Sequence, residues 1–270
     1  MRFYLHEMST VQVEQALKKT DTVIIPLGNL EAHGPHEPVG TCLILADTAA
    51  KAVGERTGVP VTPTFPVGIS HAYSNFPGSM NVRPETFAHM IKEMSLSLIH
   101  HGFKRIIYFS AHGGGNLTAL GHVAEELRDE TGVLCAVLHL WGLVSQVSPK
   151  LAAPEGVRGG HGGEPETSVM LHLRPELVDM NKANLMPLKT PLDGFTTNSH
   201  SSHLFRGGTV TIPLSGEEVS PTAVYADPSR ASAERGRQLY QNLVDYLVQF
   251  VENFRTMRIP QPPKKTGQPL

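Results

Sequence analysis

Residues 22–36 read TVIIPLGNLEAHGPH and join an apolar run to a group of polar side chains. The run from Thr22 to Pro26 is rich in β-branched residues, which predicts a buried strand. Glu31, His33 and His36 follow it closely, and Gly34 and Pro35 force an irregular path between them. Runs of the same kind predict further strands at Val59 to Phe65, Arg105 to Ser110 and Val133 to Leu140.

Segments with apolar residues at three- and four-residue spacing lie between these runs and predict helices. They are Thr10 to Lys18, Leu43 to Arg56, Pro84 to His100 and Asn116 to Glu130. Strands that alternate with helices are typical of βαβ units around a mostly parallel sheet, so the chain is predicted to be an α/β protein.

The later part of the chain has weaker patterns. Leu185 to Ser202 lacks periodicity and is predicted to form a loop or a lid before a strand at Thr209 to Pro213. A last helix is predicted at Pro228 to Phe254, because Asp227 and Pro228 suit an N-cap and a first helical position.

The composition suits one soluble domain, since 40% of the 270 residues are hydrophobic. We interpret residues 1–258 as that domain and residues 259–270, rich in Pro, Lys and Gly, as a disordered tail. The net charge of −2 provides no general attraction to nucleic acid or to a membrane, so neither is expected as a partner. With only two cysteines and no apolar segment of bilayer length, a cytoplasmic protein is predicted.

Ligands of open parallel sheets bind beyond the carboxyl ends of the strands, and polar clusters of this sequence fall there. Glu31, His33 and His36 follow the first predicted strand, Ser70 and His71 the second, and His112 the third. Carboxylate oxygens and imidazole nitrogens together suit zinc, manganese or iron. The alternative for the first cluster is a capping glutamate with histidines bound to loop backbone.

Two glycine-rich segments carry further candidates. His112 precedes three glycines, which would let the backbone pass close to an ion or a substrate. A phosphate-binding loop is the alternative, but the Lys-Ser/Thr ending of a P-loop is missing. Gly159 to Ser168 contains His161, Glu164 and Glu166 ahead of a predicted helix. Here the alternative is that both carboxylates only complement the helix dipole.

In their order and spacing these motifs resemble the creatininase (creatinine amidohydrolase) family. The family's Glu-x-His-Gly-Pro-His, Phe-Pro-Gly, His-Gly-Gly-Asn and His-x-Gly-x-x-Glu-Thr-Ser motifs correspond to Glu31 to His36, Phe76 to Gly78, His112 to Asn116 and His161 to Ser168. The match runs from about Thr22 to Val178, and Gly236 with its helix resembles the family's C-terminal end. The resemblance implies a three-layer α/β/α fold with a mostly parallel central sheet.

The resemblance also implies a metal-dependent hydrolase in which two ions, bridged by a carboxylate and a water, act on an amide C–N bond. Glu31 and His112 would hold one ion, and His33 and Glu166 the other. His161 would pass a proton to the leaving nitrogen. One or two divalent ions are expected, with zinc first and manganese or iron as alternatives. A small-molecule substrate and a homo-oligomer, a hexamer in the family, are implied as well.

Cysteine stands where the family has its bridging aspartate, because the Gly-Thr-Asp string reads Gly40-Thr41-Cys42 in this chain. Cys42 lies at the start of a predicted helix, where a thiolate is stabilised, and it is predicted to be a softer metal ligand. The alternatives are a site with a single ion or with none, and a cysteine that packs as a small apolar residue.

Other differences lie on the substrate side and argue against creatinine itself as the substrate. Glu37 replaces a residue that is usually leucine, Tyr73 replaces a histidine, and one glycine is added after His112. The candidate substrate-binding residues are His36, Glu37, Ser70, His71, Tyr73 and Trp141. His200 and His203 could reach the pocket from the predicted lid, whereas His100, His101, His122, His139 and His172 are interpreted as surface or core histidines.

Several functions remain open at this stage. The first is hydrolysis of a small cyclic substrate at an amide bond, and the second is ring opening of an oxidised inositol, a cyclic ketone of the 3-dehydro-scyllo-inosose type. Other family members remove formyl groups from pyrimidine nucleotides or act as peptidases in cofactor maturation. A third class is a non-catalytic metal- or ligand-binding subunit. Burying five ionisable groups unpaired would be costly, which favours catalysis.

Overall fold

The computed structural model describes residues 2–184 and 186–261. Its central sheet has three parallel strands in the order β1 (Thr22–Leu27), β2 (Arg105–Ser110) and β3 (Leu134–His139). The last residues of the strands, Leu27, Ser110 and His139, are paired in register. The segments that leave the three strands therefore begin at one edge of the sheet, as expected for a ligand site of this class.

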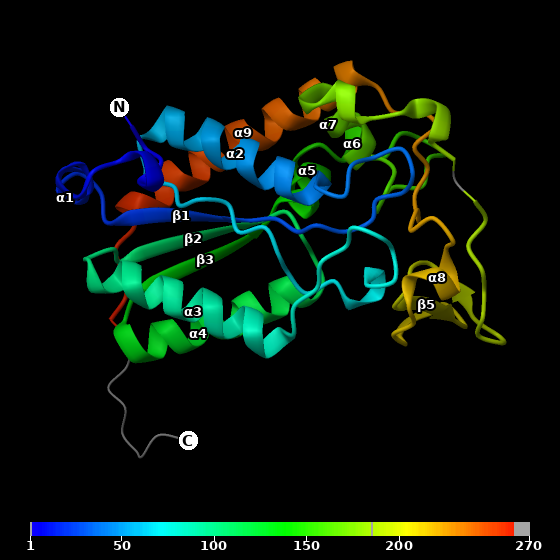
Figure 1. Ribbon diagram of the computed structural model, residues 1–270, viewed down its shortest axis with the longest axis horizontal. Helices are drawn as coiled ribbons and strands as arrows, with labels where there is room; N and C mark the ends of the chain where they lie inside the picture. Colours follow the sequence, from blue (N-terminus) through cyan, green and yellow to red (C-terminus); the bar gives the residue numbers. More distant parts are fainter. Residues whose placement is uncertain (1, 185, 262–270) are drawn as a thin grey trace, which may run out of the picture.

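Helices cover both faces of the sheet and give a three-layer α/β/α arrangement (Figure 1). One layer contains α2 (Thr41–Thr57), α5 (Leu140–Val147), α6 (Pro149–Ala152), α7 (Glu166–Leu173) and α9 (Ala233–Thr256). The other contains α3 (Pro84–His100) and α4 (Gly115–Thr131). The mostly parallel sheet and the layered fold predicted from the sequence are confirmed.

The core lies on both sides of the sheet because successive strand residues point to opposite faces. Ile24, Ile107 and Phe109 pack toward α2 and α9, whereas their neighbours Ile106 and Tyr108 pack toward α3 and α4. These five side chains are fully buried. Two packed layers hold the sheet rigidly, so the site at its carboxyl edge is built on a fixed base.

A second, antiparallel sheet lies beyond the carboxyl edge of the first, next to α8 (Gly216–Val219) (Figure 1). Its strands are β4 (Thr196–Thr197), β5 (Ser202–Phe205) and β6 (Gly208–Thr211). The remaining elements are η1 (Leu5–Glu7), α1 (Thr10–Leu17), η2 (His71–Tyr73), η3 (Pro175–Leu177) and η4 (Met180–Lys182).

Three predicted strands and four predicted helices are confirmed with ends within two residues. Val59 to Phe65 was expected to be a strand but makes only isolated parallel bridges, Val61 with Tyr4 and Ile24, and Phe65 with Leu27. Pro60 and Pro63 interrupt it, because proline has no N–H to donate to a neighbouring strand. The segment is thus an irregular edge beside β1.

Three predictions for the later chain need correction. The last helix begins at Ala233 with Ser232 as its N-cap, while Asp227 accepts a hydrogen bond from the backbone of Ser229 in the preceding turn. The predicted strand at Thr209 to Pro213 belongs to the antiparallel sheet and ends at Thr211. The segment 185–202, expected to be a loop or a lid, contains β4 and the first residue of β5, and its own first residue lies outside the described residues.

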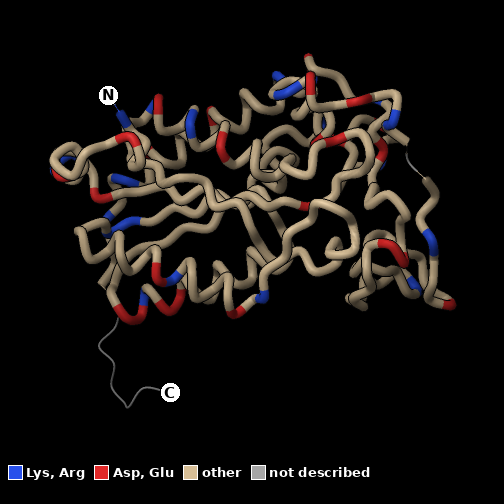
Figure 2. Tube along the Cα trace, in the orientation of Figure 1, with Lys and Arg blue, Asp and Glu red and all other residues tan. Residues whose placement is uncertain are grey.

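The predicted tail, residues 259–270, is described only as far as residue 261. There the carbonyl of Pro260 accepts a hydrogen bond from Arg128. Charged residues lie mainly on the peripheral helices and loops, with both signs interspersed (Figure 2). Within the described ranges no helix is long and apolar enough to cross a membrane.

The close approach of α7 and α9 at Gly236 leads to a stability prediction. A Cβ at Gly236 would lie 1.8 Å from the carbonyl oxygen of Ser168, so Gly236→Ala is expected to lower the free energy of unfolding by about 3 kcal/mol. Gly121→Ala on α4 is the matched control, because its Cβ meets no atom within 4 Å. The control is expected to be neutral or about 0.5–1 kcal/mol more stable. Urea denaturation measures both, and equal midpoints would contradict the prediction.

Candidate metal centre

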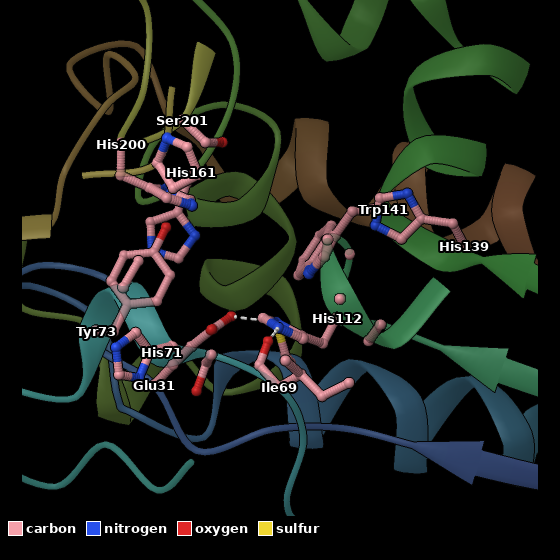
Figure 3. A pocket seen from close by; sticks show the side chains of 18 of the residues that line it. Glu31, Ile69, His71, Tyr73, His112, His139, Trp141, His161, His200 and Ser201 are labelled. Carbon is pink, nitrogen blue, oxygen red and sulfur yellow. Dashed lines mark hydrogen bonds and ion pairs between the residues drawn. The ribbon is translucent and has the colours of Figure 1, made fainter. Parts of the chain in front are cut away.

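A pocket of about 600 Å³ lies at the carboxyl edge of the parallel sheet (Figure 3). Segments far apart in the sequence line it: Glu31 after β1, His112 after β2, and His139 and Trp141 around the end of β3. Cys42 comes from the first turn of α2. The pocket therefore lies where the sequence predicted it, beyond the carboxyl ends of the parallel strands.

The Glu31 carboxylate occupies the centre of the polar cluster and is 1% exposed. Its Oε1 lies 2.8 Å from Nδ1 of His112, 3.4 Å from Sγ of Cys42 and 3.7 Å from Nε2 of His33. Burial by itself would raise the pKa of Glu31, but His112 and His33 outweigh it and lower the pKa. Glu31 is therefore an anion that lies within 3.7 Å of donor atoms of His112, Cys42 and His33.

Backbone carbonyls fix the orientation of two imidazoles. His33 donates from Nδ1 to the carbonyl of Glu31 at 3.0 Å. Its Nε2 therefore carries no proton and presents a lone pair to the cluster. His112 donates from Nε2 to the carbonyl of Ile69 at 2.9 Å, which directs Nδ1 at Glu31. Such outer hydrogen bonds are typical of metal-binding histidines, because they fix the tautomer and the ring orientation.

Glu166 is the first residue of α7 and closes the other side of the cluster. Its Oε2 lies 3.7 Å from Nε2 of His33 and accepts a hydrogen bond from the backbone of Gly162 at 3.0 Å. Burial raises the pKa of Glu166 well above its usual value, and Glu37 raises it further. No Lys or Arg side chain contacts this carboxylate among the described residues, so it suits a cation ligand.

Cys42 lies close to both carboxylate and imidazole ligands, with Sγ 3.6 Å from Nε2 of His33. Together with Glu31 these atoms form a triangle with sides of 3.4, 3.6 and 3.7 Å. Around an ion with bonds of about 2.0–2.3 Å, neighbouring tetrahedral ligands lie roughly 3.3–3.7 Å apart. The three donor atoms thus fit one face of a tetrahedral site.

The sequence predicted that the helix N-terminus would stabilise a Cys42 thiolate, and this is wrong for the protein without an ion. Burial raises the pKa of Cys42 well above its usual value, and the carboxylates of Glu31 and Glu166 raise it further. A cation in the cluster would have to displace the thiol proton.

Two groups of donor atoms share Glu31. Glu31, Cys42 and His112 form one group, and Glu31, His33 and His161 form another, each with atoms within 4.8 Å of one another. These donor atoms therefore fit a divalent cation. Cys42 lies near both His33 and His112, the two histidines that the family resemblance assigns to separate ions.

The Cys42 ligand role makes a testable prediction. Loaded with zinc, the protein should react more slowly with an alkylating reagent than the metal-free protein, and zinc binding should release a proton and tighten as pH rises. Cys42→Asp is expected to shift the preference from zinc toward manganese, since carboxylate oxygen is the harder donor. Elemental analysis and competition between the two metals measure this.

Cys135→Ala is the matched control, because Cys135 is a second free cysteine that lies in β3 and does not line the pocket. It should leave metal content unchanged. An alkylation rate at Cys42 that is the same with and without zinc, together with an unchanged metal count in Cys42→Ala, would exclude the ligand role.

His161 lies beside the cluster and lines the same pocket. It donates from Nε2 to the carbonyl of Ala32 at 2.7 Å, so Nδ1 is the ring nitrogen left to accept a proton. Its ring stacks on Tyr73 with centroids 4.6 Å apart, and the His33 ring is 4.3 Å away. Burial, followed by the neighbouring His33, lowers the pKa of His161 to about 3. The imidazole is neutral at neutral pH.

The predicted substrate-binding residues separate into two sets. Ser70, His71, Tyr73 and Trp141 line the pocket, whereas His36 and Glu37 do not. Glu37 accepts hydrogen bonds from Thr41, at 3.1 Å, and from Thr167, and His36 lies 3.3 Å from the same Thr167 hydroxyl. His36 and Glu37 form a buried network behind the metal centre.

Sequence reasoning missed some of the pocket. His139 was interpreted as a core or surface residue but lines the pocket, and Ser201, which also lines it, was not singled out. His200 lines the pocket as expected from its place in the predicted lid. His139 could have been identified from its place at a strand end, since it is the last residue of β3 and ligands bind beyond the carboxyl ends of parallel strands. His203, by contrast, is buried with its Nε2 donating to the carbonyl of Ile212 at 2.9 Å.

Carboxylates, imidazoles and a thiol around one point, beside a neutral histidine, are the donor set of a divalent-metal site. The sequence model of the creatininase family, described as creatinine amidohydrolase, matches residues 6–251. The chain belongs to the creatininase family.

Its relatives have different activities. Mycofactocin precursor peptide peptidase from Mycobacterium ulcerans (strain Agy99) is 28% identical over 89% of this chain and 88% of that protein. Creatinine amidohydrolase from Pseudomonas putida is 28% identical over 71% of this chain and 80% of that protein. 3-dehydro-scyllo-inosose hydrolase from Thermotoga maritima is 25% identical over 93% of this chain and 83% of that protein. The family is established, but these names do not single out a substrate.

Solved structures agree with the fold. The structure "Creatininase Mn" and a mutant creatininase of the "Zn-Zn type" each have a TM-score of 0.76, at 23% and 24% identity. Both alignments cover 94% of this chain and 99% of the other. At this identity they establish the architecture alone.

Proposed function

We propose that this chain hydrolyses an amide C–N bond in a small cyclic molecule, with zinc held by Glu31, His33, Cys42, His112 and Glu166. The position of His161 supports this best. One of its ring nitrogens lies within 4.8 Å of a carboxylate oxygen of Glu31 and a ring nitrogen of His33. A proton carrier therefore stands where a carbonyl bound at the centre would react.

A divalent ion at the centre supplies a Lewis acid for the carbonyl and lowers the pKa of bound water. His161 keeps Nε2–H on the carbonyl of Ala32, so Nδ1 can take a proton and pass it to the leaving nitrogen. Tyr73 holds the imidazole plane by stacking at an interplanar angle of 14°. The ring is half-buried and lines the pocket, so a substrate bound there can reach it.

Zinc is proposed because a cysteine thiol stands among two imidazoles and two carboxylates, and sulfur ligands favour zinc over harder ions. Manganese and iron are the alternatives, and one or two ions are compatible with the two donor groups.

A substrate panel on zinc-loaded protein tests the proposal. It contains cyclic amides, lactams, formamides, lactones, cyclic polyol ketones and short peptides. Turnover of cyclic amides or lactams above the other classes is expected. Turnover confined to lactones, ketones or linear peptides would reject the amide assignment.

Ring opening of a cyclic polyol ketone is the second candidate. Three imidazoles outside the proposed metal ligands, His71, His139 and His200, line the pocket and offer partners to ring hydroxyls. The Thermotoga maritima relative named for such a substrate supports it as well. The ketones in the same panel decide between the two.

A cytoplasmic location and a homo-oligomer complete the proposal. Both cysteines are free, which fits a reducing compartment, and the oligomer rests on family resemblance. Light scattering coupled to size exclusion measures the assembly, and a monomer at micromolar concentration would reject this part.

A further inference from the structure

His139 ends the third strand, in register with the last residues of β1 and β2. It also occupies the N-cap position of α5, yet its side chain makes no capping hydrogen bond. Among the described residues its ring forms no hydrogen bond at all. The fold therefore places this imidazole at the edge of the sheet without using either ring nitrogen.

Two glycines hold the His139 ring. A Cβ at Gly142 would lie 2.7 Å from Nδ1, and a Cβ at Gly113 would lie 3.2 Å from Nε2. Gly113 directly follows His112, and Gly142 lies in the first turn of α5. The ring is packed between two backbones that carry no side chains, so its orientation is restricted without any polar contact.

The ring is neutral at neutral pH, because burial and then the nearby His112 lower its pKa to about 4. A neutral imidazole has one N–H donor and one lone pair. His139 lines the pocket, so a molecule bound there can approach its ring.

The close-up view shows two walls of this pocket (Figure 3). His139 and Trp141 lie on one side, Tyr73, His161 and His200 on the other, and Glu31 and His112 between them. The described residues that line the pocket include no Lys or Arg. The wall with His139 thus offers hydrogen bonds but no cation that would bind a carboxylate or a phosphate.

We propose that His139 is a specificity-determining residue that hydrogen-bonds an uncharged polar group of the substrate, at the end of the pocket opposite His161. This inference rests on the proposed function, because it assigns one wall of the same pocket. It predicts a neutral hydroxyl, amide or carbonyl on the substrate at that wall.

The kinetic test uses the zinc-loaded protein and the best substrate of the panel. His139→Ala is expected to raise KM about tenfold, the effect of one neutral hydrogen bond, with kcat within about threefold and metal content unchanged. His139→Gln, which keeps a donor and an acceptor, should recover part of the loss. Gly142→Ala should resemble His139→Ala, because its Cβ displaces the ring. His122→Ala, on the exposed surface of α4, is the control.

The binding test needs no turnover. Trp141 is the only tryptophan of the chain and lines the same wall, so its fluorescence reports binding there. The neutral lactam 2-pyrrolidinone is expected to bind saturably to the zinc-loaded protein. His139→Ala should weaken lactam binding about tenfold.

The outcomes separate the two proposals. Lactam binding that is absent, or equal in wild type and His139→Ala, overturns the role of His139. Lactam binding without turnover of any panel member overturns the proposed function and leaves the role of His139 intact.

Discussion

Glu31→Gln is expected to lose metal at the centre and with it nearly all activity. The Oε1 atom of Glu31 approaches His112, Cys42 and His33 within 3.7 Å, so one substitution removes the charge that both donor groups share. The loss of affinity should exceed the roughly 10–100-fold effect of changing an outer hydrogen-bond partner of a metal ligand. Elemental analysis of protein purified without chelator and a zinc titration measure it.

Glu164→Gln is the matched control for Glu31→Gln. Glu164 is equally buried but pairs with Arg235 at 2.6 Å and accepts from Ser168 at 2.9 Å, away from the pocket lining. It is expected to keep its metal. Wild-type metal content in folded Glu31→Gln would contradict the assignment of the whole centre.

His161→Ala is expected to lower kcat by about two to four orders of magnitude while the metal content stays at the wild-type level. The substitution removes the imidazole that is proposed to carry the proton on Nδ1 while its Nε2 is hydrogen-bonded to the carbonyl of Ala32. Stopped-time assays on the best panel substrate measure kcat, and elemental analysis measures the metal.

His101→Ala is the control for His161→Ala, since it removes an exposed histidine at the C-cap of α3. It should be as active as the wild type. Equal activity of His161→Ala would remove His161 from proton transfer, and loss of metal in that variant would make it a ligand of the centre instead.

The regular part of the fold was predictable because its pattern is local. β-branched runs and apolar spacing predicted β1, β2, β3 and the helices beside them. Val59 to Phe65 has the same composition, but its prolines limit it to isolated bridges. The start of the last helix was misplaced because two N-cap signals compete, and Ser232 rather than Asp227 caps it.

The site was predictable where a motif or a strand end marks it. Glu31, His33 and His112 follow strands, and the structure brings them together with Cys42 and Glu166. The positions of His36 and Glu37 were not predictable, because Glu37 is bound by Thr167, 130 residues further along the chain. No local pattern contains such a contact.

The antiparallel sheet and the segment after it contribute His200, Ser201, Pro213 and Leu214 to the pocket, while the proposed metal ligands lie in segments that follow β1 and β2 and in the first turns of α2 and α7. Part of the substrate wall is thus encoded in a stretch of the chain that carries none of the proposed metal ligands. Substitutions within residues 196–214 would therefore change part of the surface that contacts a bound molecule. They would leave the proposed metal ligands and His161 in place.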